Sequence, residues 1–306
     1  MNIKDGVFSL KNGSTFLVVS ILLLVSCQRE TEILSATDTQ NVDAEVASTS
    51  YISEGSGISM IAIENISAAQ FDGGRVEADP VAGLGDKDDR LKCAKVMITR
   101  TGTKDKPAGT ITITFDPSCA DRNGVKRSGS IVITYNGKRS VPGSYWTLKY
   151  KEFSRNDTHI EGTDSVVTQL SSNSQNLQFQ SFLIGGKITF QDKKSITQVH
   201  NLTREWLRTS TPTNDEWHTL KGGTASGTTK KGNSYEMQIT NDIVEKLSCR
   251  ASKVFIPVSG TKKIIVTTPQ VTNHYKIDYG DGSCDNDVKV IINGKMKIVT
   301  VSSDGN

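Results

Sequence analysis

Strict alternation of apolar and hydroxyl side chains is the feature that most limits how this chain can fold. Residues 110–115 alternate two isoleucines and a phenylalanine with threonines, and residues 130–135 continue the pattern. A period of two places all the apolar side chains on one face of a β-strand. Aromatic residues make up only 6% of the chain. The core must therefore rest largely on Val, Ile, Leu and Thr, a usage that favours strands.

Similar runs continue to the end of the chain, with turn residues between them at regular intervals. This pattern predicts an all-β fold, an antiparallel meander that forms a sandwich or a rolled or extended sheet, with at most one or two short helices. We expect strands over residues 110–115, 130–135, 146–150, 165–170, 177–183, 187–190, 196–200, 234–239, 253–258, 262–268, 274–279, 287–292 and 295–301.

Local signals refine this arrangement. The pairs Asn136-Gly137 and Asn293-Gly294 each predict a two-residue hairpin, because both residues tolerate the positive φ of a type I′ turn. Residues 241–247 predict a short helix that begins with polar capping residues. Residues 68–90, rich in glycine, predict a loop.

The N-terminus predicts a lipoprotein. A start that bears Lys4 and Lys11 leads to an apolar run over 16–25 and then to the sequence Leu-Val-Ser before Cys27. Such a run is half of the roughly 20 residues that a membrane-spanning helix needs. We therefore predict a signal peptide over 1–26 and a mature chain that starts at a lipidated Cys27, carrying palmitate-type acyl chains. Gln28 in place of Asp after this cysteine favours the outer membrane, on its periplasmic or its cell-surface face.

Residues 27–57 are rich in Ser, Thr and acidic side chains and predict a flexible tether. Apolar residues near helical spacing over 58–66 indicate a short helix only weakly, and Gly55 and Gly57 are expected to interrupt any continuous helix. Residues 58–306 form the predicted all-β domain. An aromatic strand end, a Ser-Cys, a strand and an Asn-Gly-Lys turn recur in the same order within 91–170 and 245–306. These halves arose by duplication, or their strands are alike by chance.

Four cysteines lie beyond the lipidation site, and an even number in an exported chain predicts two disulfides. We favour Cys93 with Cys119 and Cys249 with Cys284, since each pair closes a local loop. Free thiols are one alternative. A zinc site is another, but zinc sites usually contain cysteines two to four residues apart, and here they lie further apart.

Two groups of residues could bind a ligand. Asp278, Asp281, Asp285 and Asp287 offer hard oxygens for calcium, although Asp and Gly also occur in ordinary turns. Trp206 and Trp217 flank a polar loop and, if exposed, could stack on sugar rings. In a chain so poor in aromatic residues, burial of both rings in the core is the other interpretation.

The sequence predicts a protein that is not an enzyme and has no cofactor. It contains no Gly-x-Ser-x-Gly, His-Glu-x-x-His or Walker motif, and its four histidines lie far apart. A Ser, a His and an acid that converge in one cleft would instead indicate a hydrolase. The net charge of +3, with basic residues scattered along the chain, predicts no nucleic-acid partner.

Several motifs together resemble a known family. The lipobox, the Phe-Asp-Pro-Ser-Cys turn at 115–119, the strand at 129–135 and the terminal Asp-Tyr-Gly-Asp-Gly-Ser-Cys-Asp-Asn at 278–286 resemble uncharacterised Bacteroidota outer-membrane lipoproteins, from about residue 58 to the C-terminus. The resemblance implies an envelope location and an all-β fold, but no activity. We therefore expect a noncatalytic binding or structural role, anchored to the membrane through the lipid, with a protein partner or, alternatively, a glycan bound by the tryptophans.

Overall fold

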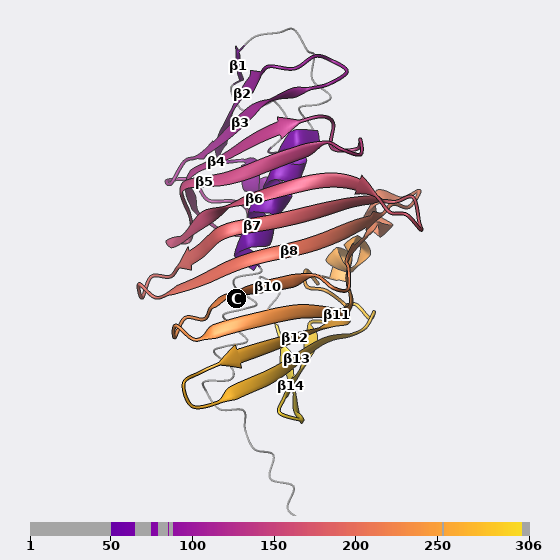
Figure 1. Ribbon diagram of the computed structural model, residues 1–306. Coiled ribbons are helices and arrows are strands. Elements are labelled where there is room, and N and C mark those ends of the chain that lie inside the picture. Colours follow the sequence, from indigo (N-terminus) through magenta and orange to yellow (C-terminus); the bar gives the residue numbers. More distant parts are fainter. Residues whose placement is uncertain (1–49, 65–74, 79–84, 86–87, 253, 302–306) are drawn as a thin grey trace, which may run out of the picture. The chain divides into compact units, whose positions relative to one another are not determined.

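The computed structural model describes residues 50–64, 75–78, 85, 88–252 and 254–301. They form one 15-stranded antiparallel sheet in which neighbouring strands follow the chain order, with β9 as the exception (Figure 1). The predicted all-β meander is thereby confirmed. The strands are β1 (Arg75–Ala78), β2 (Ala94–Arg100), β3 (Ala108–Phe115), β4 (Arg127–Asn136), β5 (Tyr145–Arg155), β6 (Thr158–Leu170), β7 (Leu177–Thr189), β8 (Ser195–Leu207), β9 (Glu216–Thr219), β10 (Thr224–Thr228), β11 (Ser234–Lys246), β12 (Ser259–Thr267), β13 (Thr272–Asp281), β14 (Asp287–Ile292) and β15 (Lys295–Thr300).

One face of this sheet carries the core. Ile111, Ile133 and Leu148 are direct cross-strand neighbours on β3, β4 and β5, and each is at most 1% exposed. Burial of a side chain of this size contributes about 1.5–3 kcal/mol. Apolar residues of β2–β7 form a first hydrophobic cluster, and those of β10–β14 form a second. The alternation in the sequence thus sets which face is buried.

Residues 50–64 form a helix that packs into the first cluster through Ile58, Ala62 and Ile63 (Figure 1, indigo). The expectation that Gly55 and Gly57 interrupt a helix is therefore wrong. A Cβ at Gly55 would lie 2.0 Å from the Tyr150 hydroxyl, so this glycine lets the helix approach β5 closely. Contact with the sheet offsets the weak helix propensity of glycine.

The tether prediction fails at its C-terminal end, because residues 50–57 belong to this helix. The signal peptide, Cys27 and the rest of the tether lie outside the described residues. Within the predicted loop at 68–90, β1 pairs with β2, and residues 89–91 form the 3₁₀ helix η1 (Asp89–Leu91). In the part of the chain that the structure describes, no helix is long and apolar enough to span a membrane.

Three local predictions are wrong. They are the helix at 241–247, the strand at 253–258 and the two-residue hairpin at Asn136-Gly137. Residues 241–246 extend β11 instead of forming a helix, because β9 and β12 both pair with this stretch and bury Ile243. The strand expected over 253–258 is irregular in its described residues, where Val254 and Val258 pack against Cys249 beside η3 (Leu247–Ser252).

Asn136-Gly137 does not form a two-residue turn, since Asn136 pairs with Tyr145 and an eight-residue loop joins the two. The Gly137 N–H donates to the Pro107 carbonyl, 2.6 Å away, which directs the chain out of the hairpin path. Asn293-Gly294 does form the predicted turn. Both residues have positive φ, 48° and 85°, and Ile292 pairs with Lys295.

One strand position in the middle of the sheet is shared. β9 pairs with the C-terminal parts of β8 and β11, whereas β10 pairs with the N-terminal part of each. The two short strands thus lie end to end between the same neighbours. Residues 208–215, which include η2 (Pro212–Asn214), connect β8 to β9 at one end of the sheet.

Candidate functional site

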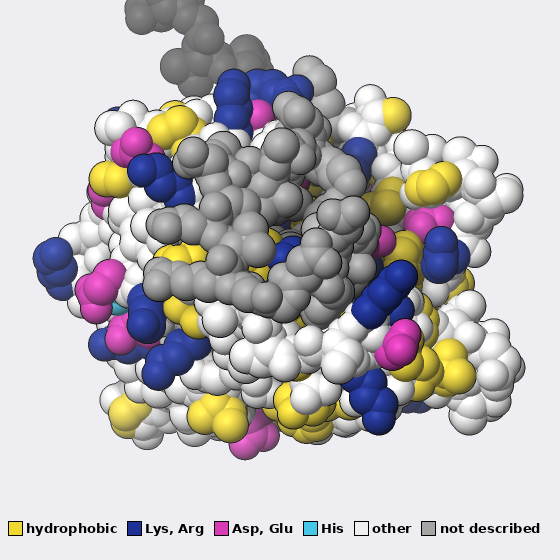
Figure 2. Space-filling view, turned by 90° about the horizontal axis from the view of Figure 1, so that it is seen from above, with side chains coloured by type: hydrophobic (Ala, Val, Ile, Leu, Met, Phe, Trp, Pro, Cys, Tyr) yellow, Lys and Arg dark blue, Asp and Glu magenta, His cyan; other side chains and the backbone are white. Residues whose placement is uncertain are grey.

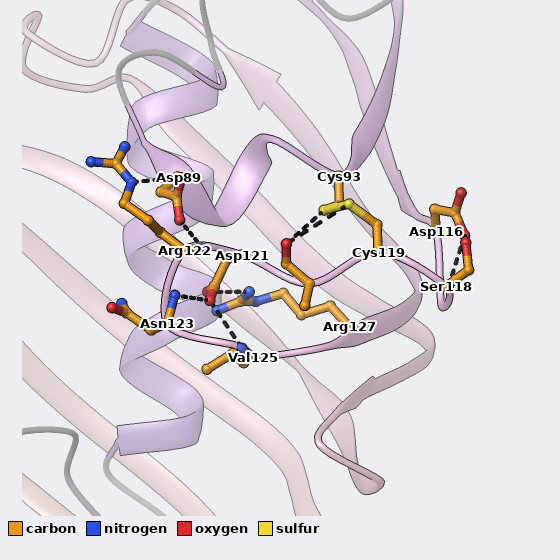
Figure 3. Close-up of a disulfide and its surroundings, with 11 residues drawn as sticks. Asp89, Cys93, Asp116, Ser118, Cys119, Asp121, Arg122, Asn123, Val125 and Arg127 are labelled. Carbon is orange, nitrogen blue, oxygen red and sulfur yellow. Dashed lines mark hydrogen bonds and ion pairs between the residues drawn. A yellow bond between two sulfur atoms is a disulfide. The ribbon is translucent and has the colours of Figure 1, made fainter.

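The two predicted disulfides are present. Cys93 and Cys119 have Cα atoms 5.6 Å apart, and Cys249 and Cys284 have theirs 5.2 Å apart. Figure 3 shows the first disulfide between the start of β2 and the loop that follows β3. Both pairs close local loops, as the spacing suggested.

The loop next to the first disulfide carries a charge network (Figure 3). Asp121 accepts hydrogen bonds from the backbone N–H groups of Asn123 and Val125 and pairs with Arg127 at 2.8 Å. Burial alone would raise the pKa of Asp121, but the Arg127 guanidinium and the Val125 N–H outweigh it and lower the pKa.

The same arginine connects the loop to the helix. Arg127 Nε donates to Glu54 Oε1 at 2.6 Å, and Arg155 lies 3.0 Å from the other oxygen of Glu54. Glu54 and Arg127 are 8% and 5% exposed. These buried ion pairs fix the helix to the ends of β4 and β5, so we assign the network a structural role.

The four candidate calcium residues do not converge. Asp278, Asp281 and Asp285 each accept the backbone N–H two residues further on, and Asp287 accepts the Thr300 hydroxyl. The first three are the contacts of ordinary Asx turns, and the fourth joins the paired strands β14 and β15. Among the described residues, no group of three or more His, Cys, Asp or Glu side chains could hold a metal ion.

Trp206 and Trp217 are direct partners across β8 and β9, and their rings stack 5.4 Å apart with an interplanar angle of 6°. Both are partly buried against the first hydrophobic cluster. Arginine guanidinium groups lie over them. Arg139 and Arg208 are 4.7 Å and 4.9 Å from the Trp206 ring centre, and Arg204 is 4.9 Å from that of Trp217. Ring–ring and guanidinium contacts thus occupy the faces on which a sugar would stack.

The edge of Trp206 is fixed as well. Its Nε1–H donates to Asp215 Oδ2 at 2.9 Å, and the other oxygen of this buried carboxylate accepts the Thr209 N–H at 2.7 Å. Asp215 therefore holds the loop over residues 208–215 against the indole. The structure brings the two predicted tryptophans together in a packed arrangement, with both rings partly buried against the core.

A buried polar group that sequence reasoning missed lies between the two hydrophobic clusters. Ser181 on β7 donates to Asp164 Oδ1 on β6 at 2.6 Å, and its Oγ lies 2.7 Å from His200 Nε2 on β8. The side chains of Asp164 and His200 are 4% and 5% exposed. The sequence contained a signal for this group. All three polar residues occupy the alternating positions that hold apolar, core-facing residues elsewhere in these strands.

Burial dominates the titration of this group. It raises the pKa of Asp164, with the Ser181 hydrogen bond as a smaller opposing effect, and lowers the pKa of His200 to about 4. Because the single Ser181 proton goes to Asp164, the Ser181 oxygen accepts the His200 Nε2–H, and Nδ1 faces the Gln198 amide 3.4 Å away.

This order differs from that of a hydrolase. In a catalytic triad the imidazole lies between the acid and the serine and takes the hydroxyl proton. Here the serine lies between the other two, and the imidazole donates to it. The arrangement satisfies the hydrogen bonds of two buried side chains and the partly buried Ser181, and it can bind a proton.

On the face seen in Figure 2, Lys and Arg side chains are interspersed with Asp, Glu and apolar side chains, so both signs of charge share that face. No protein-family model matches the chain, and searches of curated proteins and of solved structures find no similar protein.

Proposed function

We propose that this chain is a lipid-anchored protein of the bacterial outer membrane, of the Bacteroidota type, with a noncatalytic role in binding another envelope component. The observation that supports a noncatalytic role is the order of Asp164, Ser181 and His200. Asp164 and His200 have buried side chains, and the hydroxyl proton of Ser181 is directed to Asp164, away from the imidazole.

A fluorophosphonate probe tests this proposal, because it labels serines that an adjacent base activates. We expect no labelling that depends on Ser181, measured by mass spectrometry of the full chain. Ser165→Ala, on the same strand as Asp164, is the matched control. Labelling that Ser181→Ala abolishes and Ser165→Ala preserves would establish a hydrolase instead.

The lipid anchor has a separate test. An alkyne-bearing palmitate analogue should label the wild-type chain in a bacterial host, and Cys27→Ser should lose both the label and retention in the outer-membrane fraction. Ser26→Ala keeps a small residue before the cleavage site and should retain both. Equal labelling of the Cys27→Ser chain would contradict the assignment.

The glycan alternative keeps one point in its favour, the adjacency of Trp206 and Trp217. Against it, guanidinium groups lie over both rings. A saturating polysaccharide at 100 times its dissociation constant would stabilise the fold by about 2.7 kcal/mol. We expect no polysaccharide in a thermal-shift panel to do so. A saturable shift that Trp206→Ala removes without unfolding the chain would favour the glycan.

A further inference from the structure

A row of apolar side chains crosses four neighbouring strands at one end of the sheet. Leu170 pairs with Leu177, Leu177 with Trp206, and Trp206 with Trp217. At the strand spacing of a β-sheet, the row extends for about 15 Å. We call this row, together with Arg208, the rim.

Part of the rim is exposed. Leu170 lies on the same face of the sheet as the buried Val166 and has an exposed fraction of 47%, and Val141 in a neighbouring loop also has 47%. The loop with Val141 stays close to β6, because the Gly143 N–H donates to the Thr168 carbonyl at 2.8 Å. Trp and Arg, which meet on this face, are enriched at the centres of protein interfaces.

The three arginines on the tryptophans differ in their partners. Arg139 pairs with Glu64 at 2.8 Å, and Arg204 pairs with both oxygens of Glu245 at 3.1 Å. Arg208 is exposed and stacks on Trp206, but no carboxylate of a described residue lies within ion-pair distance of it. The nearby Asp215 already accepts hydrogen bonds at both oxygens.

The position over the indole gives Arg208 a particular chemistry. A guanidinium above an aromatic ring retains N–H donors in the fork geometry that a carboxylate accepts. The contact with Trp206 also restricts the long side chain before a ligand arrives, which lowers the entropy cost of binding. Arg208 is therefore complementary to a partner that carries an acidic group next to an apolar surface.

We propose that the rim is the docking surface for a protein segment that places an acidic side chain on Arg208 and an apolar side chain on Leu170. The proposal rests on the proposed binding function and specifies its partner. A protein segment fits better than an acidic polysaccharide, because the exposed member of the row, Leu170, is aliphatic, and guanidinium groups cover the aromatic faces that a sugar needs.

Selection from a random peptide library on phage, with the full chain in detergent as the target, tests this proposal. Wild-type chain should enrich peptides that combine Asp or Glu with apolar residues. Arg208→Glu should reverse the charge preference of the selection and should bind the peptides enriched on the wild-type chain at least tenfold more weakly. Arg250→Glu, a charge reversal at another exposed arginine, should leave both unchanged.

Leu170→Lys provides a second variant at an exposed position, where a folding defect is not expected. It should weaken the binding of the same peptides. Enriched peptides whose binding ignores Arg208→Glu would overturn the proposal, as would the absence of any enrichment. Saturable binding of polygalacturonate that depends on Arg208, without peptide selection, would replace the protein partner with an acidic glycan. None of these results changes the outcome of the Ser181 labelling, so the noncatalytic proposal fails or stands separately.

Discussion

His200 shows how a single buried residue makes this fold sensitive to acid. Its imidazole is neutral in the folded protein because burial lowers its pKa to about 4. In the unfolded chain a histidine has a pKa of about 6.5. The unfolded state therefore binds more protons between these two values, and stability falls as the pH falls through that window. Asp164 opposes this trend, since burial raises its pKa and favours protonation in the folded state.

We predict that the free energy of unfolding falls by about 2 kcal/mol between pH 7 and pH 5 on account of His200. His200→Gln removes the titrating group and should flatten this dependence, as measured by urea denaturation at both pH values. His274→Gln, at an exposed histidine, is the control and should leave the slope unchanged. An identical slope in wild type and His200→Gln would contradict the prediction.

Glu54 is the second residue with a large expected effect. Its carboxylate contacts two guanidinium groups, those of Arg127 and Arg155, and is 8% exposed. Glu54→Gln leaves buried positive charge without its partner and should cost about 3 kcal/mol or more in unfolding free energy. Glu161→Gln breaks a pair with Lys187 in which both side chains are 46% exposed, and should cost less than about 1 kcal/mol. Equal losses would show that the buried network contributes no more than a surface pair.

At the scale of elements, periodicity predicted the strands well and failed where tertiary contact decides. Most expected ranges lie inside observed strands because their alternation fits a sheet with one buried face. Residues 241–246 and the helix at 50–64 were misjudged for the same reason. Pairing with β9 and β12, and packing on Tyr150, are contacts between distant parts of the chain that no local window contains.

The helix allows a matched test of this explanation. Alanine favours a helix over glycine by about 1 kcal/mol. At Gly57 the added Cβ meets only the far end of the Arg90 side chain, at 3.2 Å, so a small shift of this guanidinium relieves the contact and Gly57→Ala should be neutral or stabilising. At Gly55 it would meet the Tyr150 ring, and Gly55→Ala should destabilise by about 1–3 kcal/mol because of overpacking. Thermal unfolding of both variants checks the order, and a stabilised Gly55→Ala chain would refute the packing argument.

At the scale of the whole molecule, the meander predicted from the sequence and the two disulfides agree with the structure. The candidate ligand-binding residues are arranged differently from the prediction, because the aspartates do not converge and the tryptophans pack against each other. The cysteine pairing followed from loop lengths alone. The stacking of Trp206 on Trp217 and the Asp164–Ser181–His200 group depend on which strands become neighbours and in what register. Register follows from the complete sheet, so neither contact could be derived from one strand at a time.

The two disulfides constrain different parts of this sheet and should respond differently to a reductant. They span 26 and 35 residues, so loop closure alone gives each a contribution of about 2–4 kcal/mol. Cys249 is 1% exposed and packs with Val254 and Val258, but its partner Cys284 is exposed, whereas Cys93 and Cys119 are both only partly exposed. Because exchange requires a thiolate to reach one of the two sulfurs, attack at Cys284 should open Cys249–Cys284 first.

Mild dithiothreitol followed by alkylation and mass spectrometry measures this order. Paired substitutions to serine test stability separately. Cys249→Ser with Cys284→Ser adds a poorly solvated hydroxyl to the buried cluster around Cys249 and should cost more than Cys93→Ser with Cys119→Ser. Earlier reduction of Cys93–Cys119 would contradict the accessibility argument, and a larger loss of stability in Cys93→Ser with Cys119→Ser would contradict the burial argument.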